Sequence, residues 1–489
     1  MTDKIVGTAL TFDDVLLVPA KSAVLPNQVD LRTRLVEGIR LNIPLISAAM
    51  DTVTGSRTAI TMAREGGLGI IHKGYPIDKQ AVKVSKVKRS QSGQITKPYY
   101  LGPSARLNDV RQLMEGYNIS GVPIVEKGKK LIGLVTKRDI LFLPANDNPK
   151  VREIMKPRDE LVVAPPETTL VQAKDILHQH RIEKLPLVDD HDVLFGLITV
   201  KDILKEVQYP RAVRDAKGRL LVGAAIGAGA DLKDRTAALM EAGVDVLCLD
   251  SSHGHSVGVL QAVEWVKSKY PAIPLIGGNI STYQGAKDLI AAGVDAVKVG
   301  QGPGSICTTR VVTGGGMPQI TAIMEAVRAA REHDIPVIAD GGIQFSGDIT
   351  KALAAGADTV MIGSLFAGTE ESPGETVLVE GSSYKVYRGM GSVDAMKESG
   401  GERYFQENAA KMVAEGIVGR VPFRGSLSEV IFQLIGGLRS GMGLAGSANI
   451  SQLQQAKLVQ VTSAGVRESH PHDVVITKEA PNYPGQERR

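Results

Sequence analysis

Three segments of the chain share one pattern of hydrophobic and polar positions: an alanine-rich stretch with apolar residues at helical spacing, then a glycine, then an apolar run. The glycines are Gly243, Gly293 and Gly356. A helical pattern that ends at glycine is typical of a helix with a glycine C-cap. A short apolar run after it is typical of a buried parallel strand. We therefore predict a helix followed by a strand in each segment.

Five further apolar runs have the same strand-like character. They are Pro44 to Ala49, Gly67 to Ile71, Leu220 to Ile226, Pro274 to Gly277 and Pro336 to Ala339. With the three runs above they make eight candidate parallel strands separated by helices. Eight is the strand number of the (β/α)8 barrel, or TIM barrel, so the predicted fold class is α/β with this barrel.

One gap breaks this arrangement, because about 150 residues lie between Ile71 and Leu220, where a single helix is expected. Inside the gap one pattern occurs twice, offset by 63 residues, in Pro123 and Pro186, Gly133 and Gly196, and Asp139 and Asp202. Each copy predicts helix, strand, turn, strand and helix. We expect a barrel formed by residues 1–92 and 216–489, with inserted modules at 93–153 and 154–215.

Composition narrows the class of protein. Apolar residues make up 43% of the chain and charged residues 22%, as in soluble globular proteins. The longest apolar run, Leu220 to Ala230, is shorter than the ~20 residues of a membrane helix. Residues 1–14 lack the apolar core of a signal peptide, and two cysteines cannot form a disulfide framework, so we expect a cytoplasmic protein. The net charge is only +4, which does not call for a nucleic-acid partner.

Glycine is in excess, with 53 residues, and gathers at the ends of the apolar runs, as in loops that bind phosphate. After the sixth strand Gly300, Gly302 and Gly304 alternate, and Cys307 follows. Barrel enzymes carry catalytic groups in loops at this end of the strands, so Cys307 is a candidate nucleophile. A lone cysteine more often only packs in the core, and that interpretation fits Cys248, which lies inside an apolar run.

Four features of the chain belong together: the loop Gly300 to Arg310, the turn Asp340-Gly341-Gly342, the motif Tyr387-Arg388-Gly389-Met390-Gly391 and the interrupted barrel. With these features the chain resembles the bacterial inosine 5′-monophosphate (IMP) dehydrogenases over nearly its full length. The inserted duplication resembles a tandem CBS domain pair. The resemblance implies NAD-dependent oxidation of IMP to xanthosine 5′-monophosphate (XMP) through a covalent thioimidate on the cysteine, the committed step of guanine nucleotide synthesis. It also implies a homotetramer or an octamer.

This resemblance assigns the covalent attack to Cys307. The segment from Ser392 to Lys411 is then a flap whose Arg403 and Tyr404 enter the vacated dinucleotide site and activate water together with Thr309. Because a guanidinium normally stays protonated, either Arg403 acts through a minor neutral form or Thr309 shares this step with it. The sequence leaves both alternatives open.

The IMP site is expected at the loops after strands seven and eight, where barrels commonly bind phosphate. Gly341, Gly342, Gly363 and Ser364 lie there, although Gly363-Ser364 also suits an ordinary strand-to-helix turn. The resemblance implies the remaining contacts. They are Asp340 for the ribose, Ser305 and Tyr387 for the phosphate, and Met390, Gly391 and Glu415 for the base, with Arg388 and Gly389 in the same motif.

By the same resemblance, Asp250 binds the nicotinamide ribose of NAD. The other dinucleotide contacts are expected from Ser251, Ser252, Asn279, Gly300, Gln301 and Gly302. The nearby His253 and His255 raise the alternative of a zinc site, but the sequence offers no third ligand at helical spacing.

The resemblance also implies a potassium ion (K⁺) bound by main-chain oxygens. The expected ligands are Gly302, Gly304 and Cys307, together with Glu468, Ser469 and His470 from a neighbouring subunit. Carbonyl oxygens suit this ion because they replace its hydration shell without adding charge. The alternative for the three tail residues is a surface charge cluster.

In the CBS modules the resemblance implies a regulatory purine nucleotide, ATP or GTP. Its expected contacts are Thr136, Asp139, Thr199 and Asp202. The alternative is that the two aspartates only start helices.

Two other functions are weighed against the dehydrogenase. A GMP reductase shares the barrel and the cysteine loop, but typically lacks the CBS pair and the Arg-Tyr flap. A nucleotide-sensing regulatory protein would use the barrel as a scaffold, although Cys307, Thr309 and Arg403 are all present. The stretch Gly441 to Gly446 matches the G-x-G-x-x-G dinucleotide fingerprint, but it follows a helical pattern and no strand, so we treat the match as accidental.

Overall fold

A computed structural model describes residues 4–90, 98–117, 119–144, 146–399, 401–404, 406 and 411–483, without the side chains of residues 202, 205, 206, 399 and 402. The chain divides into two compact units, which we call the barrel unit and the insertion unit. The barrel unit comprises Met1–Lys88, Arg211–Val213 and Leu220–Arg489. The insertion unit comprises Arg89–Pro210 and Arg214–Arg219.

The barrel unit is built around a closed ring of parallel strands. In chain order they are β4 (Leu45–Ser47), β5 (Leu68–Ile71), β11 (Gly223–Ile226), β12 (Val246–Asp250), β13 (Leu275–Ile280), β14 (Ala296–Val299), β15 (Val337–Asp340) and β16 (Thr359–Ile362). Each strand coincides with one of the apolar runs, so the predicted (β/α)8 barrel is confirmed.

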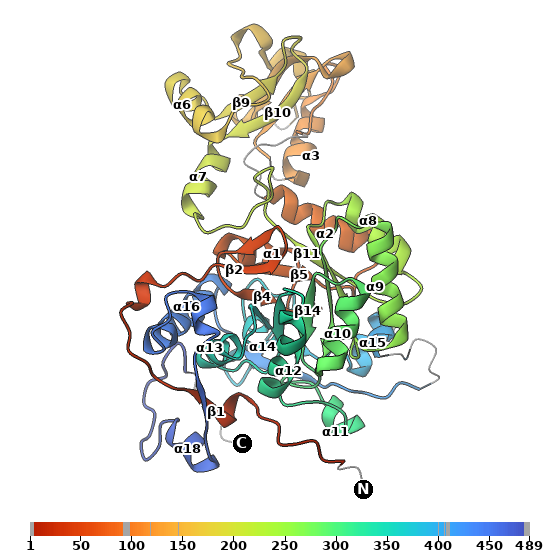
Figure 1. Cartoon of the computed structure of the whole chain (residues 1–489). Helices are drawn as coiled ribbons and strands as arrows, with labels where there is room; N and C mark the ends of the chain where they lie inside the picture. Colours follow the sequence, from red (N-terminus) through yellow and green to blue (C-terminus); the bar gives the residue numbers. More distant parts are fainter. Residues whose placement is uncertain are drawn as a thin grey trace. The chain divides into compact units, whose positions relative to one another are not determined.

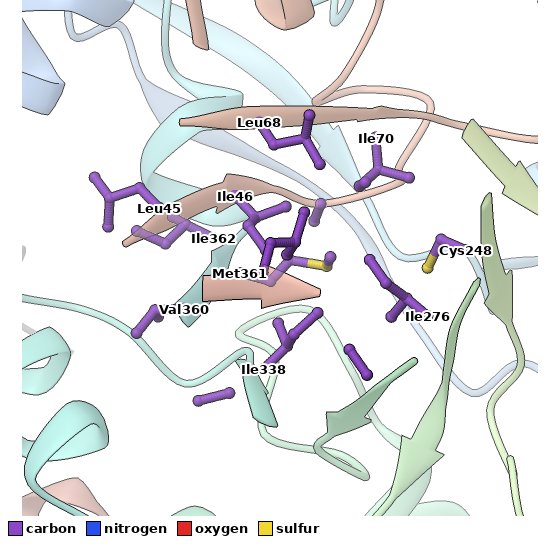
Figure 2. Close-up of a cluster of buried hydrophobic side chains, with 14 of the residues drawn as sticks. Leu45, Ile46, Leu68, Ile70, Cys248, Ile276, Ile338, Val360, Met361 and Ile362 are labelled. Carbon is purple, nitrogen blue, oxygen red and sulfur yellow. The ribbon is translucent and has the colours of Figure 1, made fainter. Parts of the chain in front are cut away.

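Strand side chains fill the centre of the barrel. Figure 2 shows Ile46, Ile276, Ile338 and Met361 gathered between the strands, and all four side chains are almost fully buried. Cys248 belongs to the same cluster and is completely buried, which confirms that this cysteine packs in the core. Strands that are covered on both faces carry apolar residues at consecutive positions, which explains why the sequence revealed them.

Helices cover the outside of the ring. They include α1 (Ser56–Glu65), α2 (Ile77–Ser90), α8 (Leu232–Glu241), α9 (Val257–Lys269), α10 (Tyr283–Ala292), α12 (Gln319–Arg331), α13 (Ser346–Ala354), α14 (Ser364–Ala367) and α16 (Leu427–Leu444). Figure 1 shows α9, α10 and α12 side by side around the strands. Gly243, Gly293 and Gly356 have φ angles of 80°, 107° and 109°, in the left-handed region that favours glycine after a helix, as predicted.

Smaller elements surround the barrel. They are η1 (Phe12–Asp14), β1 (Val15–Leu17), η2 (Pro26–Gln28), β2 (Thr33–Val36), β3 (Ile39–Leu41), α11 (Thr309–Thr313), β17 (Thr376–Val379), β18 (Ser382–Arg388), α15 (Val393–Ser399), η5 (Glu402–Tyr404), β19 (Val418–Pro422), α17 (Ile450–Leu453), β20 (Leu458–Gln460) and α18 (Ser463–Glu468). The predicted flap segment between β18 and β19 is therefore partly helical. No helix in the described ranges is long and apolar enough to cross a membrane.

The stretch Gly441 to Gly446 covers the end of α16 and the residues just after it. A dinucleotide fingerprint has to join a strand to a helix, and this stretch ends a helix instead. The interpretation of the match as accidental is confirmed.

Residues Arg211–Val213 belong to the barrel unit, whereas the expected boundary at 215 assigns them to the second inserted module. The amide of Val213 donates to the carbonyl of Ala63 at 2.9 Å, and the amide of Leu221 donates to the carbonyl of Val213 at 3.1 Å. Val213 is a single buried apolar residue next to charged ones, so its hydrophobic pattern is too short to be recognised in the sequence.

The insertion unit repeats one order of elements. The first copy contains α3 (Leu107–Tyr117), β6 (Gly121–Val125), β7 (Leu131–Thr136) and α4 (Lys137–Ile140), followed by α5 (Val151–Ile154), β8 (Lys156–Pro157) and η4 (Arg158–Glu160), with η3 (Lys127–Lys129) in its turn. The second contains α6 (Leu170–His180), β9 (Lys184–Val188), β10 (Leu194–Thr199) and α7 (Val200–Gln208). Both copies thus have the predicted order of helix, strand, strand and helix.

The cores of the two copies use equivalent residues. Val122, Ile124 and Val135 are buried in the first core, and Leu185, Leu187 and Ile198, each 63 positions later, are buried in the second. A third cluster joins the copies through Val125, Leu131, Val188 and Leu194, which form two pairs with the same offset. The duplication seen in the sequence is therefore also a duplication of the packed core.

Candidate active site

A cavity of about 290 Å³ lies at the carboxyl ends of the barrel strands, where the loops after five of the strands and the end of β13 contribute to its wall. It brings together most of the residues singled out in the sequence. Those at the cavity are Cys307, Thr309, Arg403 and Tyr404; Ser305, Asp340, Gly341, Gly342, Gly363, Ser364, Tyr387, Gly389, Met390 and Glu415; and Asp250, Ser252, Asn279, Gly300, Gln301, Gly302 and Gly304. Residues that are distant in the sequence thus share one site.

The cysteine loop is held in place mainly by backbone contacts. Cys307 forms an antiparallel bridge with Gly416, and the amide of Thr308 donates to the carbonyl of Glu415 at 3.0 Å. The Cys307 Sγ lies 3.1 Å from the Thr309 Oγ1, within hydrogen-bond distance for sulfur. Gly300 has φ +148°, and a Cβ there would lie 2.2 Å from the carbonyl oxygen of Asp340, so only glycine fits. The loop therefore fixes a thiol beside a hydroxyl at the edge of the cavity.

Tyr387 lies at another part of the wall, against the loop after β16. Its side chain is almost fully buried, and burial raises the pKa of the phenol well above its usual range, while a hydrogen bond with Ser305 opposes that effect. A Cβ on Gly363 would lie 2.8 Å from the phenol oxygen, so glycine at this position makes room for the hydroxyl. A neutral hydroxyl donor and backbone groups thus meet where phosphate is expected.

The floor of the cavity contains a buried ionic cluster centred on Lys298. The Lys298 Nζ donates to the Asp250 Oδ1 at 2.9 Å, to the Asp340 Oδ2 at 3.0 Å and to the Asn279 Oδ1. The Asn279 Nδ2 in turn donates to the Asp340 Oδ2 at 2.9 Å and to the Gly300 carbonyl at 2.8 Å. Sequence reasoning missed Lys298, although a lysine inside the apolar run of β14 is an available signal.

Arg403 of the flap segment contacts two residues that are expected to bind the dinucleotide. Its guanidinium forms an ion pair with the Asp250 Oδ2, and its carbonyl accepts from the amide and hydroxyl of Ser252 at 3.1 and 2.8 Å. Tyr404 packs over Gly391, where a Cβ would be 2.7 Å from the phenol ring. Burial raises the pKa of Tyr404, so its hydroxyl remains protonated at neutral pH.

Three expected nucleotide contacts are absent from the cavity lining. Ser251 is buried behind Ser252, and its hydroxyl accepts from the amide of His253 at 3.3 Å. Gly391 lies beneath the Tyr404 ring. Arg388 was expected near IMP, but its guanidinium binds Asp51 at 2.6 Å. Successive side chains of a strand point to opposite faces, so Tyr387 at the cavity directs Arg388 away from it.

The two histidines after β12 have separate partners. His253 Nδ1 lies 3.1 Å from the Gln301 amide nitrogen, and His255 Nε2 lies 2.6 Å from an oxygen of Asp288. Hydrogen bonds from His255 and Gln284 lower the pKa of Asp288. Within the part of the chain that the structure describes, no three His, Cys, Asp or Glu residues form a group suited to a metal ion.

The three tail residues expected near the potassium ion lie at the end of α18 and just after it, and they do not line the cavity. In Figure 1, α18 and α11 stand on opposite sides of the lower part of the barrel unit. The Nδ1 of His470 is 2.8 Å from the hydroxyl of Tyr483, and its ring packs against Phe345. Within one chain, the two halves of the expected potassium site are therefore not brought together.

In the insertion unit, Asp139 forms a helix cap. Its Oδ2 accepts from the amide and the hydroxyl of Thr136, both at 2.7 Å, at the start of α4. Asp139 therefore makes the contacts expected of an aspartate that starts a helix. Thr199 ends β10 directly before α7, and the side chain of Asp202 lies outside the described residues.

Comparisons with known proteins agree on one family. The family model "IMP dehydrogenase / GMP reductase domain" matches residues 9–472. The inosine-5′-monophosphate dehydrogenase of Aquifex aeolicus is 56% identical over 98% of this chain and 99% of its own length. That of Bacillus subtilis is also 56% identical, over 97% of each protein.

A solved structure is similar over nearly the whole chain. It is a cysteine-to-alanine variant of the GMP reductase of Trypanosoma brucei in complex with guanosine 5′-monophosphate, with a TM-score of 0.90 and 37% identity over 96% of this chain and 99% of that one. The barrel, its cavity and a family match that runs through both units together show that this chain belongs to the IMP dehydrogenase/GMP reductase family.

Proposed function

We propose that this chain catalyses the NAD-dependent oxidation of IMP to XMP in guanine nucleotide synthesis. The observation that carries the proposal is the convergence of Cys307, Thr309 and Arg403 on one cavity. Full-length relatives that are 54–56% identical and are named inosine-5′-monophosphate dehydrogenases support it.

In the first half of the reaction the Cys307 sulfur attacks C2 of the hypoxanthine base and loses its proton. The Thr309 hydroxyl, 3.1 Å from the sulfur, is within hydrogen-bond distance to receive or relay that proton. NAD, when bound, accepts the hydrogen of C2 with its electron pair. The base is then attached to Cys307 as a thioimidate.

The cavity residues expected to bind the dinucleotide carry polar groups that suit NAD. The Oδ2 of Asp250 faces the flap, where it binds a guanidinium and could equally accept ribose hydroxyl protons. Asn279, Gln301 and Ser252 supply amide and hydroxyl groups at the same wall. Asp250 is thus available either to a ribose or to Arg403, but not to both through one oxygen.

In the second half, water attacks C2, the C–S bond breaks, XMP leaves and Cys307 regains a proton. Arg403 already lies at Asp250, so a flap in this position excludes the nicotinamide ribose and occupies the site after NADH leaves. We assign water activation to Arg403 and Thr309 jointly, because a neutral guanidine is a minor species at physiological pH.

Binding of IMP is assigned to the rest of the cavity. Asp340 holds the ribose hydroxyls, since its Oδ1 accepts no hydrogen bond from the described part of the chain. The phosphate contacts are Ser305, Gly341, Gly342, Gly363, Ser364 and Tyr387, and the base contacts are Met390 and Glu415. Gly341 and Gly342 have φ of 90° and 82°, in the left-handed region that favours glycine, and the amide of Gly341 donates to the carbonyl of Met361 at 3.3 Å.

A potassium ion fits the cysteine loop chemically, because the loop offers backbone oxygens and few side chains. Gly302 has φ +80°, and a Cβ there would lie 2.5 Å from Arg310, so the bend that exposes these oxygens requires glycine. We assign the ion to the carbonyls of Gly302, Gly304 and Cys307, with Glu468, Ser469 and His470 from a second subunit of a homotetramer. Its role is to hold the loop. Replacing K⁺ by Li⁺ at equal ionic strength is expected to lower turnover.

For the insertion unit we propose a CBS pair that binds a purine nucleotide, ATP or GTP, near Thr136, Asp139, Thr199 and Asp202. The matched order of elements and the equivalent cores of the two copies support this assignment. Its consequence would be regulation of activity or of the change from tetramer to octamer.

GMP reductase is the second candidate, and the similarity to the Trypanosoma brucei enzyme favours it. That protein aligns with 96% of this chain, so it includes the insertion, and the presence of an insertion does not separate the two activities. The position of Arg403 at Asp250 is the feature that favours dehydrogenation, because only a hydrolytic reaction needs a water-activating group there.

Two assays with the purified chain distinguish these functions. The first follows NADH formation from IMP and NAD, and the second follows NADPH consumption with GMP. We expect the first reaction only, with XMP as product. NADPH oxidation by GMP without NADH formation from IMP would instead identify a reductase, and activity in neither assay would favour the regulatory protein.

A further inference from the structure

Among the side chains that the structure describes, Lys298 is the largest that is fully buried, with an exposed fraction of 1%. A buried ammonium group is costly unless anions and acceptors surround it closely. Here they come from three strands: Asp250 at the end of β12, Asn279 in β13 and Asp340 at the end of β15.

The two carboxylates that Lys298 binds belong to different halves of the cavity. Asp340 uses its Oδ2 for Lys298 and Asn279, which leaves its Oδ1 toward IMP. Asp250 uses its Oδ1 for Lys298, which leaves its Oδ2 for Arg403 or a ribose. Lys298 therefore sets which oxygen each aspartate presents.

The charges of the cluster also indicate that Lys298 holds the two aspartates in position. Without Lys298, two carboxylates would face each other in a buried site, and like charges in such a site repel and turn apart. With Arg403 on Asp250, the cluster contains two cations and two anions. When Arg403 leaves, Lys298 is the cation that remains beside both carboxylates, and the cluster keeps a net charge of −1.

We propose that Lys298 is a positioning residue that couples the two nucleotide halves of the site, by orienting Asp340 for the IMP ribose and Asp250 for the dinucleotide. The proposal rests on the proposed function. Lys298 touches neither reacting atom, so its effect is on the affinity for both nucleotides, and any change at one aspartate is transmitted to the other.

The test uses the full chain with Cys307→Ala, which binds without turnover. Adding Lys298→Met removes the charge and keeps the length of the side chain. We expect calorimetry to give about ten- to a hundredfold weaker binding of IMP and of NAD, as for the loss of hydrogen bonds to charged groups. Lys88→Met is the matched control, because Lys88 is also a buried lysine, with its Nζ 2.7 Å from Asp245, away from the cavity. It should lower stability and leave both affinities unchanged.

A double-variant cycle isolates the coupling. Asp250→Asn, on the dinucleotide side, should weaken IMP binding when Lys298 is present and have less than a twofold effect on it in Lys298→Met. If Lys298→Met does not fold, Lys298→Gln replaces it with the same expectations. Affinities within twofold of the parent in a folded variant, or an equal effect of Asp250→Asn in both backgrounds, would overturn the proposal. Should the unmodified chain prove to be a reductase, the same affinities are measured with GMP, so the two proposals fail separately.

Discussion

The chain contains two cysteines whose surroundings differ completely. Cys248 is sealed in the barrel core, where burial raises the pKa of its thiol, and Cys307 lies at the cavity beside the hydroxyl of Thr309. A thiolate is the reactive form, and it needs a polar, accessible site. The same side chain therefore packs in the core at one position and is proposed to be a nucleophile at the other.

Substitution of the two cysteines separates these roles. Cys307→Ala should abolish NADH formation and leave IMP binding detectable, because only the nucleophile is lost. Cys248→Ala should leave turnover within about twofold and cost about 1 kcal/mol of unfolding free energy through the cavity it leaves. Steady-state kinetics and chemical unfolding measure both effects. Turnover in Cys307→Ala above the background would contradict the assignment.

His72, directly after β5, makes the free energy of unfolding depend on pH. Burial, and then the positive charges of Arg388, Lys83 and Arg235, lower its pKa to about 3 from 6.5. Between these values the unfolded chain binds a proton that the folded chain excludes, so stability rises with pH in this range and falls on acidification. At pH 5 the lowered pKa of His72 reduces the free energy of unfolding by about 2 kcal/mol relative to neutral pH.

His72→Phe keeps a ring beside Tyr75 and removes the titration. We expect it to be less stable than the parent at pH 7, because the Gly74 amide loses its acceptor, and to lose less stability than the parent between pH 7 and pH 5. Thermal unfolding at the two pH values tests this difference. Equal pH dependence in both proteins would show that His72 does not titrate in this way.

At the scale of elements, the flap segment is tied to the cavity by a few contacts at its tip. Arg403 binds Asp250 and Ser252, and Tyr404 packs on Gly391. These contacts occupy residues that we propose to bind the dinucleotide in the first half-reaction. We therefore expect the flap to act after hydride transfer and its residues to affect hydrolysis alone.

Arg403→Ala should accordingly form about one NADH per active site in a rapid burst and then turn over very slowly. The IMP-derived adduct should accumulate on Cys307 and be visible by mass spectrometry of the intact chain. Arg420→Ala, on the exposed strand β19 against Tyr384, serves as a control and should show normal turnover. A missing burst in Arg403→Ala would mean that the arginine serves binding or hydride transfer.

The strands of the barrel and the glycines that precede three of them were predictable, because a strand covered on both faces has one continuous apolar signal. The direction of Arg388 was not, since it depends on which face of β18 turns toward the cavity, and both faces carry polar residues. Lys298 was missed because its partners come from three other positions in the chain. Such a cluster exists only after the barrel has closed. The roles given to the cavity residues stay predictions.

At the scale of the whole molecule, the insertion has its own cores and leaves the barrel between α2 and β11. In a barrel this helix-to-strand connection is at the edge opposite the loops that form the cavity. None of the cavity residues belongs to the insertion unit. The insertion should therefore regulate and not catalyse.

Replacing residues 93–209 by a glycine-serine linker should preserve dehydrogenation and remove any response to ATP or GTP. A longer deletion, 93–215, also removes Arg211–Val213, whose backbone bonds to Ala63 and Leu221 belong to the barrel unit, and should unfold at a lower temperature. Activity assays with and without nucleotide, and thermal unfolding, compare the two. A folded but inactive short deletion would assign the insertion a catalytic part.

The cluster that joins the two inserted copies has a consequence for their origin. Val125 and Leu131 lie in one cluster with Val188 and Leu194, and each of the first two is there with its own duplicate. A contact made of duplicates is self-complementary, like the interface of a twofold symmetric dimer. Each module therefore carries the same apolar residues for this contact, and two identical copies of one module would present matching surfaces to each other.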